Sequence, residues 1–259
     1  MNTTDDTMIA LVTGANKGIG REIAARLAAL GHTVVIAARG AEPGEKAAAE
    51  LRATGAEATS VVLDVTDPAS VAAAAAEVEA RYGRLDVLVN NAGVAAPPGS
   101  GLADQRPRTA NLDVLRSIFE TNVFGVVTVT NALLPLLRRS SAPRIVNVSS
   151  GAGSLGAMTD PQVAAVVYAG LSADDLPLAV GYVPSKTALN ALTVQYAKDL
   201  EPDGILVNAV DPGYCATDLN GHSGHRTPAQ GAVAAVRMAT VPAGGPTGTF
   251  SDDRGPVPW

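Results

Sequence analysis

Short apolar runs alternate with alanine-rich stretches along most of this chain, and this alternation restricts its fold most. The runs are rich in Val, Ile and Leu without strict alternation, which is typical of strands buried on both faces; they lie at 8–14, 33–39, 58–64, 85–91, 144–150 and 205–211. The stretches suited to crossover helices lie at 18–30, 42–53, 68–81, 111–137 and 182–201. Repeated β-α-β units predict an α/β fold, a doubly wound sheet with helices on both faces.

Local signals refine this prediction. Asp67 before Pro68 is a typical helix start, with an N-cap followed by proline in the first turn. The closing segment TGTFSDDRGPVPW can hold a seventh, short strand around 247–250. With no repeat and no obvious linker, we expect one domain over residues 1–259.

Composition excludes several classes of function. The chain has 259 residues, 47% of them hydrophobic, enough for one large core. A net charge of −6 without a basic stripe argues against nucleic acid as a partner. The polar amino terminus MNTTDDTM and the lack of an apolar run of roughly eighteen residues argue against a signal peptide and a membrane span. A lone cysteine, Cys215, is expected to be a packing residue in a reducing compartment, so we expect a cytoplasmic protein.

A glycine-rich turn follows the first predicted strand. The segment TGANKGIG, residues 13–20, carries glycines at 14, 18 and 20 and leads into a helix near Ile19. Such a turn lets backbone N–H groups approach a pyrophosphate at the positive end of the helix dipole. A tight strand-to-helix turn without a ligand is the alternative. Because the motif follows a strand and opens a helix, we expect a dinucleotide site that includes Gly14, Asn16, Lys17, Gly18, Ile19 and Gly20.

The second strand ends in Arg39, where an NAD site would carry a carboxylate for the ribose. An arginine there suits a 2′-phosphate, with Lys17 as a second cation, and this predicts NADP(H) as the cofactor. The alternative is a solvated surface arginine. Asp64, at the end of the third strand, can accept a hydrogen bond from the adenine amino group or cap a turn.

The stretch GYVPSKTAL, residues 181–189, places Tyr182 and Lys186 one helical turn apart. Any two residues with this spacing are neighbours on a helix, so the pair by itself does not establish a site. Pro184 lies between them and is tolerated only in the first turn of a helix. The pair is therefore predicted to lie at a helix start.

Together these residues resemble the short-chain dehydrogenase/reductase family. The resemblance covers about residues 8–250 and rests on TGANKGIG, Asp64-Val65, NNAG at 90–93, Asn122, the serine of VNVSS, Tyr182 with Lys186, and PG with Thr217. It implies a Rossmann-type sheet of about seven strands. TGANKGIG, Arg39, RLDVLVNNAG and the closing segment are similar to the NADPH-dependent monomeric carbonyl reductase branch.

The resemblance also assigns roles. Tyr182 would donate the proton in carbonyl reduction and act as the base in oxidation; Lys186, a nearby cation, would favour the phenolate and hold the nicotinamide ribose. Ser150 would donate a hydrogen bond to the substrate oxygen, with Ser149 as the less favoured choice. Asn122 would distort its helix and position a water in a proton relay, although an asparagine satisfied locally on a helix is the alternative. The remaining cofactor-binding residues implied are Val65, Asn91, Ala92, Gly93, Pro212, Gly213 and Thr217.

Two features are individual to this sequence. Ser150 and Tyr182 lie 32 residues apart, farther than in most family members, so an insertion at about 151–181 is expected to form one or two short helices, starting near Asp160 and within 172–176, that cover the substrate mouth. By analogy this favours a monomer, without excluding a homo-oligomer. Asp211 stands where the family usually has an uncharged residue.

The predicted reaction is NADPH-dependent reduction of a carbonyl compound. The segments 94–107 and 214–227 and the insertion are mostly small and apolar, which favours a neutral lipophilic ketone or aldehyde. An alcohol, steroid or polyol dehydrogenase working in oxidation is the nearest alternative, and a non-enzymatic NADP-binding regulator is a third. His222 and His225 lack a third ligand, so we expect no metal site, and Trp259 is expected to anchor the tail.

Overall fold

The computed structural model describes residues 7–168 and 178–259 and contains one sheet of seven parallel strands in the order β3-β2-β1-β4-β5-β6-β7. The strands are β1 (Ile9–Thr13), β2 (Thr33–Ala38), β3 (Ala58–Val62), β4 (Val87–Asn90), β5 (Arg144–Val148), β6 (Leu206–Val210) and β7 (Phe250–Ser251). The order reverses between β1 and β4, which places the ends of these two strands beside a crevice suited to a nucleotide. The predicted fold class is confirmed, including the short seventh strand.

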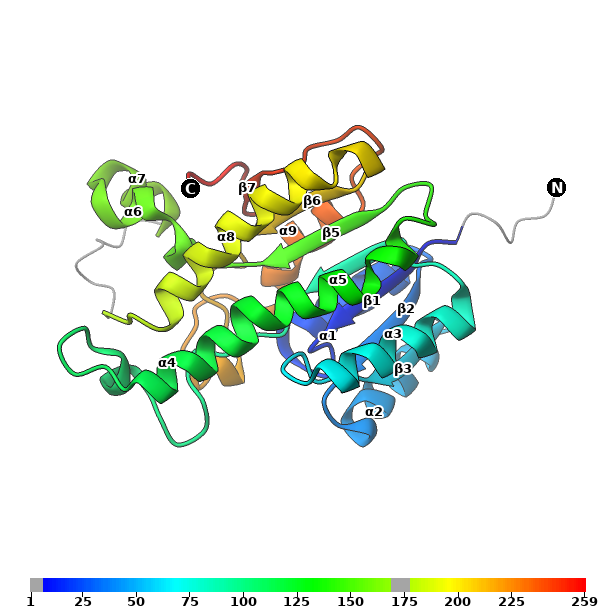
Figure 1. Cartoon of the computed structure of the whole chain (residues 1–259), viewed down its shortest axis with the longest axis horizontal. Helices are drawn as coiled ribbons and strands as arrows, with labels where there is room; N and C mark the ends of the chain where they lie inside the picture. Colours follow the sequence, from blue (N-terminus) through cyan, green and yellow to red (C-terminus); the bar gives the residue numbers. More distant parts are fainter. Residues whose placement is uncertain (1–6, 169–177) are drawn as a thin grey trace.

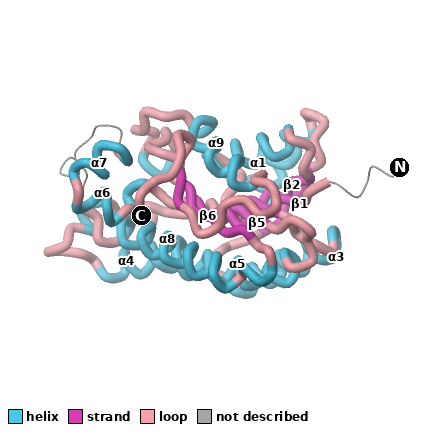
Figure 2. Tube along the Cα trace, turned by 90° about the horizontal axis from the view of Figure 1, so that it is seen from above, coloured by secondary structure: helices cyan, strands magenta, loops and turns pink. Residues whose placement is uncertain are grey.

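Helices cover both faces of the sheet (Figure 1, Figure 2). One face carries α1 (Gly18–Ala29) and α9 (Pro228–Ala239), which pack on each other, and α2 (Ala41–Arg52). The other face carries α3 (Pro68–Tyr82), α5 (Gly125–Leu137) and α8 (Tyr182–Asp199). Two apolar cores result, one on each face of the same strands, because neighbouring residues of a strand point to opposite faces.

Helix starts follow the predicted capping residues. The Asp67 carboxylate accepts a hydrogen bond of 2.9 Å from the N–H of Ala69, with Pro68 as the first residue of α3. Asp160 caps α7 (Pro161–Val167) in the same way, accepting from the N–H of Gln162 at 2.8 Å. The insertion also contains α6 (Leu155–Thr159), while the helix start expected at 172–176 lies outside the described residues.

The helix predicted over 111–137 is interrupted. It consists of α4 (Leu112–Phe119), a π-helical turn over Glu120–Phe124, and α5. By length and hydropathy the 26-residue helical segment Leu112–Leu137 could cross a membrane, but Leu133, Leu136 and Leu137 are buried against the sheet, as in a core helix. Helix α9 was missed from the sequence, although Thr227 before Pro228 and Gln230 three residues after the cap form a capping box.

Candidate active site

The glycine-rich turn leaves the start of α1 open. Gly14 and Gly18 have φ angles of +64° and +58°, a left-handed conformation that glycine adopts without strain. A Cβ on Gly20 would lie 2.6 Å from the carbonyl oxygen of Gly14 and 2.4 Å from Asn91 Nδ2, so only glycine fits there. No side chain caps the N-terminus of α1. Its backbone N–H groups can therefore meet an anion.

The segment after β4 lies directly beside this turn. Thr13 Oγ1 accepts hydrogen bonds from the N–H groups of Asn91 and Ala92 at 2.9 and 3.0 Å. The Asn91 amide donates back to the Thr13 carbonyl at 2.8 Å. The structure thus brings together the two predicted nucleotide-binding segments at the reversal of strand order.

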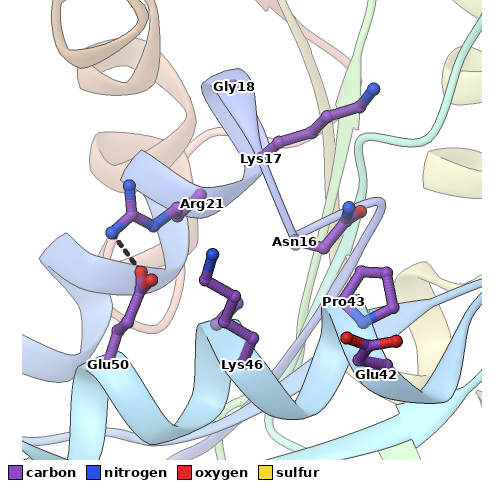
Figure 3. Close-up of a pocket in the computed structure, with 9 residues that line it drawn as sticks. Asn16, Lys17, Gly18, Arg21, Glu42, Pro43, Lys46 and Glu50 are labelled. Atoms are coloured by element: carbon purple, nitrogen blue, oxygen red, sulfur yellow. Dashed lines mark hydrogen bonds and ion pairs between the residues drawn. The ribbon is translucent and has the colours of Figure 1, made fainter.

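A cavity of about 520 Å³ separates the glycine-rich turn from α2. Figure 3 shows the Lys46 side chain reaching from α2 toward the turn, while Arg21 pairs with Glu50. The other lining residues are Asn16, Lys17, Gly18, Glu42, Pro43 and Ala47. Arg39, the predicted 2′-phosphate ligand, is exposed directly after β2 but does not line this cavity. Arg21 and Lys46 are cations that the motif did not predict, since they belong to helix faces.

The loop after β6 closes on the same turn from the other side. Lys17 Nζ pairs with Asp218 Oδ2 at 2.5 Å, and Thr217 Cγ2 lies 3.6 Å from where a Cβ on Gly18 would stand. Lys17 is therefore directed toward this loop in Figure 3, away from α2. Asp218 also contacts His222 Nε2 at 2.8 Å, and no group of three residues suited to a metal occurs among the described residues.

Asp64 and Val65 follow β3. Asp64 Oδ1 accepts hydrogen bonds from the N–H and hydroxyl groups of Thr66 at 2.9 and 2.8 Å, so the turn-capping alternative is realised. Its predicted contact with adenine stays a prediction. Val65 is buried and packs against Gly125, where a Cβ would lie 2.9 Å from Val65 Cγ2.

Tyr182 and Lys186 lie at the start of α8, as predicted. Lys186 Nζ is 5.9 Å from the centre of the Tyr182 ring and donates to the Val148 carbonyl at 2.9 Å. Burial of the ammonium lowers the pKa of Lys186 to about 8. Pro184 is the third residue of the helix, where its missing N–H leaves no bond unmade.

The pKa of Tyr182 is raised to about 12, mainly by burial; a hydrogen bond with Ser150 acts in the opposite direction, and the negative charge of Asp211 adds to the increase. The expectation that Lys186 favours the phenolate stays a prediction, since the shift follows mainly from burial. The phenol is held protonated at neutral pH.

The two serines after β5 have different surroundings. Ser149 is buried and its hydroxyl donates to Asn190 Oδ1 at 2.6 Å. Ser150 is partly exposed, hydrogen-bonds to Tyr182, and accepts from the N–H of Ala152 at 3.2 Å. Of the two serines Ser150 is the one that contacts Tyr182, whereas Ser149 ties β5 to α8; the catalytic role of Ser150 stays a prediction.

Asn122 lies within the π-helical turn, so the predicted distortion of its helix is present. Its Oδ1 accepts from the Val94 N–H at 2.9 Å, and its Nδ2 donates to the Val94 carbonyl at 2.9 Å and to Ser185 Oγ at 3.0 Å. Gly93 lies between Asn122 and Lys186: a Cβ built on Gly93 would lie 3.3 Å from Asn122 Oδ1 and 3.5 Å from Lys186 Nζ. The role of Asn122 in a water relay stays a prediction.

Gln105 is a site residue that the sequence did not reveal. It is fully buried, its Oε1 accepts from the N–H of Tyr182 at 2.8 Å, and its Nε2 donates to the Ala95 carbonyl at 2.8 Å. Because α8 has no capping side chain of its own, this amide satisfies its first N–H. No sequence motif marks this role, since Gln105 is 77 residues from Tyr182.

The segments after β6 and β7 contain the remaining residues singled out in the sequence. Pro212 is buried, and Gly213 has φ of +72° with Arg226 Cδ 2.7 Å from where its Cβ would stand. Trp259 stacks on Phe250 with ring centres 5.6 Å apart and accepts a hydrogen bond from the Gly156 N–H at its carbonyl, so it anchors the tail on the insertion as predicted. Cys215 is buried, also as predicted.

Comparison with known proteins agrees with this geometry. The family model described as short chain dehydrogenase matches residues 8–169 and 157–227. The chain belongs to the short-chain dehydrogenase family. It is therefore a member of a family of oxidoreductases that act on alcohol and carbonyl groups.

Three relatives of this short-chain dehydrogenase illustrate the similarity. (−)-Isopiperitenone reductase from Mentha piperita is 35% identical over 302 residues, covering 93% of this chain and 95% of that protein. The structure of salutaridine reductase from Papaver somniferum matches with a TM-score of 0.76 at 31% identity, covering 95% of this chain and 99% of that chain. A gluconate 5-dehydrogenase from Burkholderia cenocepacia, in complex with NADP and tartrate, matches with a TM-score of 0.77 at 27% identity, covering 96% and 94%.

Proposed function

We propose that the protein is an NADPH-dependent reductase of a neutral lipophilic ketone or aldehyde. The observation that carries this proposal is the convergence of Ser150, Tyr182 and Lys186 at the carboxyl end of β5, with the phenol of Tyr182 held protonated. In reduction, Tyr182 donates its proton to the carbonyl oxygen, and Ser150 polarises that oxygen through a hydrogen bond.

The chain fits a dinucleotide in three respects. The start of α1 has uncapped N–H groups, Gly20 allows the turn to approach α1 closely, and Lys46 reaches into the adjacent cavity from α2. The glycine-rich turn, Asn91–Gly93, Asp64, Thr217 and Lys186 would hold NADPH, which supplies the hydride when bound. The NADP in the related gluconate 5-dehydrogenase supports this assignment, and exposed Arg39 at the end of β2 would contact the 2′-phosphate.

The apolar character of the predicted mouth supports a lipophilic substrate. Among the described residues of segments 94–107, 151–181 and 214–227, six large apolar side chains are exposed: Leu102, Leu155, Val166, Leu178, Tyr214 and Leu219. The name of the isopiperitenone reductase indicates a ketone substrate for that relative. The related gluconate 5-dehydrogenase supports a second candidate function, oxidation of an alcohol or polyol.

The test is consumption of NADPH with a panel of ketones and aldehydes, measured beside the Tyr182→Phe variant. We expect turnover by the wild type and a loss of at least about 10²-fold in kcat for the variant, with NADPH binding retained, because only the proton donor is removed. Turnover restricted to NADP⁺ with alcohols would favour the second function. Binding of NADPH without turnover of any substrate would favour a regulator.

A further inference from the structure

Asn190 is a buried amide on α8 that the proposed reaction leaves without a role. It lies one helical turn after Lys186, on the same face of the helix, and is 3% exposed. Asparagine is a poor helix former, and burying an amide costs free energy unless its oxygen and its nitrogen both find partners. Here both partners belong to the segment that carries Ser150.

Asn190 contacts both ends of the segment Ser149–Gly153, which follows β5. Its Oδ1 accepts a hydrogen bond from the Ser149 hydroxyl at 2.6 Å, and its Nδ2 donates to the Gly153 carbonyl at 3.3 Å. Ser150 lies between these two contacts and forms the start of the turn, since its carbonyl accepts from the Gly153 N–H at 2.9 Å. One amide on α8 therefore holds the turn that carries Ser150 at its two ends.

The same turn packs directly on α8 at Lys186. A Cβ on Gly153 would lie 2.8 Å from the backbone carbonyl carbon of Lys186 and 3.0 Å from its Cβ, so only glycine fits there. The Thr187 hydroxyl also donates to the Gly153 carbonyl, at 3.1 Å. The position of Ser150 relative to the catalytic end of α8 is therefore set by this close contact and by the hydrogen bonds around it.

We propose that Asn190 is a positioning residue that fixes the Ser150 hydroxyl relative to Tyr182. The inference rests on the proposed function, in which both groups act on one carbonyl oxygen. Because their geometry must match that oxygen closely, a turn released from α8 lowers kcat. Lys186 keeps its own hydrogen bond to the Val148 carbonyl at 2.9 Å, so binding of NADPH does not depend on Asn190.

The test is Asn190→Leu, which keeps most of the side-chain volume and removes both hydrogen bonds. Hydrogen exchange followed by mass spectrometry reports on the turn without any turnover. The amides of Gly153 and Ser154, which donate to the carbonyls of Ser150 and Gly151, should exchange at least about tenfold faster in the variant. We expect kcat for carbonyl reduction to fall about ten- to a hundredfold, while Kd for NADPH, measured by fluorescence quenching, stays near the wild-type value.

Thr193→Val is the matched control on the same helix. Thr193 is fully buried, and its hydroxyl accepts from Asn147 Nδ2 at 2.9 Å and donates to the Leu189 carbonyl at 2.9 Å. Both partners lie outside the segment Ser149–Gly153. The control therefore leaves a buried amide without a partner, as a merely structural change would, and should lower the midpoint of thermal unfolding. We expect it to keep the wild-type exchange of the turn and the wild-type kcat.

If Asn190→Leu does not fold, Ser149→Ala removes only the first of the two contacts and should give smaller changes in the same direction. Unchanged exchange of the turn or unchanged kcat in Asn190→Leu, or an equal loss of kcat in Thr193→Val, overturns the inference. A wild type without carbonyl turnover instead refutes the proposed function, and the exchange measurement then decides by itself whether Asn190 holds the turn.

Discussion

The amide of Gln105 supports the catalytic helix at its first residue, so Gln105→Leu should impair both stability and catalysis. The variant keeps most of the side-chain volume but leaves the Tyr182 N–H and the Ala95 carbonyl without their partner. An unpaired buried group costs about 1 to 3 kcal/mol, and because Ala95 and Tyr182 are only partly buried we take the lower end for each, about 2 kcal/mol in total. In a chain of this size that lowers the midpoint of thermal unfolding by about 4 to 8 °C.

The catalytic effect follows from position. Gly181, the residue before Tyr182, packs closely against the same amide: a Cβ built on Gly181 would lie 2.7 Å from Gln105 Oε1. Displacement of the phenol by about 1 Å can lower kcat by about 10²-fold. The assays are thermal unfolding followed by circular dichroism and steady-state carbonyl reduction.

Gln195→Leu is the control, since Gln195 is an exposed glutamine on α8, the helix that carries Tyr182. We expect it to match the wild type in both assays. Wild-type unfolding temperature and kcat in Gln105→Leu would show that neither hydrogen bond matters, and would refute the argument that this amide positions Tyr182.

Two further predictions concern charge. Arg39→Asp should raise KM for NADPH by about ten- to a hundredfold more than KM for NADH, since a charged hydrogen bond contributes about 1.5 to 3 kcal/mol. Arg81→Asp, on α3, is the control. Equal effects of Arg39→Asp on both cofactors would remove Arg39 from the 2′-phosphate site. The pKa of Lys186 is lowered from 10.5 to about 8, so between these pH values the unfolded chain binds more protons than the folded chain. The free energy of unfolding of the wild type therefore rises with pH across this range. At neutral pH, Lys186→Met should be more stable than the wild type. Toward pH 10.5 the difference in free energy of unfolding between the two proteins, measured by denaturant titration, should decrease by up to about 3 kcal/mol. A difference that does not change with pH would contradict a buried, destabilised ammonium.

Local patterns in the sequence determined the fold class and most of the candidate site. Parallel strands buried on both faces need continuous apolar runs, and a crossover helix needs a dozen or so residues, so the alternation of the two is visible without any tertiary information. The close approach at Gly20 and the one-turn spacing of Tyr182 and Lys186 are likewise consequences of backbone geometry over a few residues.

Other features of the site depend on contacts between distant segments. The choice of Ser150 over Ser149 follows from Asn190, which occupies the Ser149 hydroxyl, and the capping of α8 follows from Gln105. Lys17 was expected at the 2′-phosphate, but the loop after β6 brings Asp218 to its ammonium. None of these partners lies within a motif.

The sequence by itself determined that Tyr182 and Lys186 are neighbours at a helix start, because the α-helix repeats every 3.6 residues whatever surrounds it. Only the tertiary structure decided how these two groups titrate. Burial by segments far apart in the chain removes water from both side chains and places the Asp211 carboxylate near the phenol, which raises the pKa of Tyr182 and lowers that of Lys186. Desolvation is a property of packing and not of spacing, so no local pattern could have predicted its sign or its size.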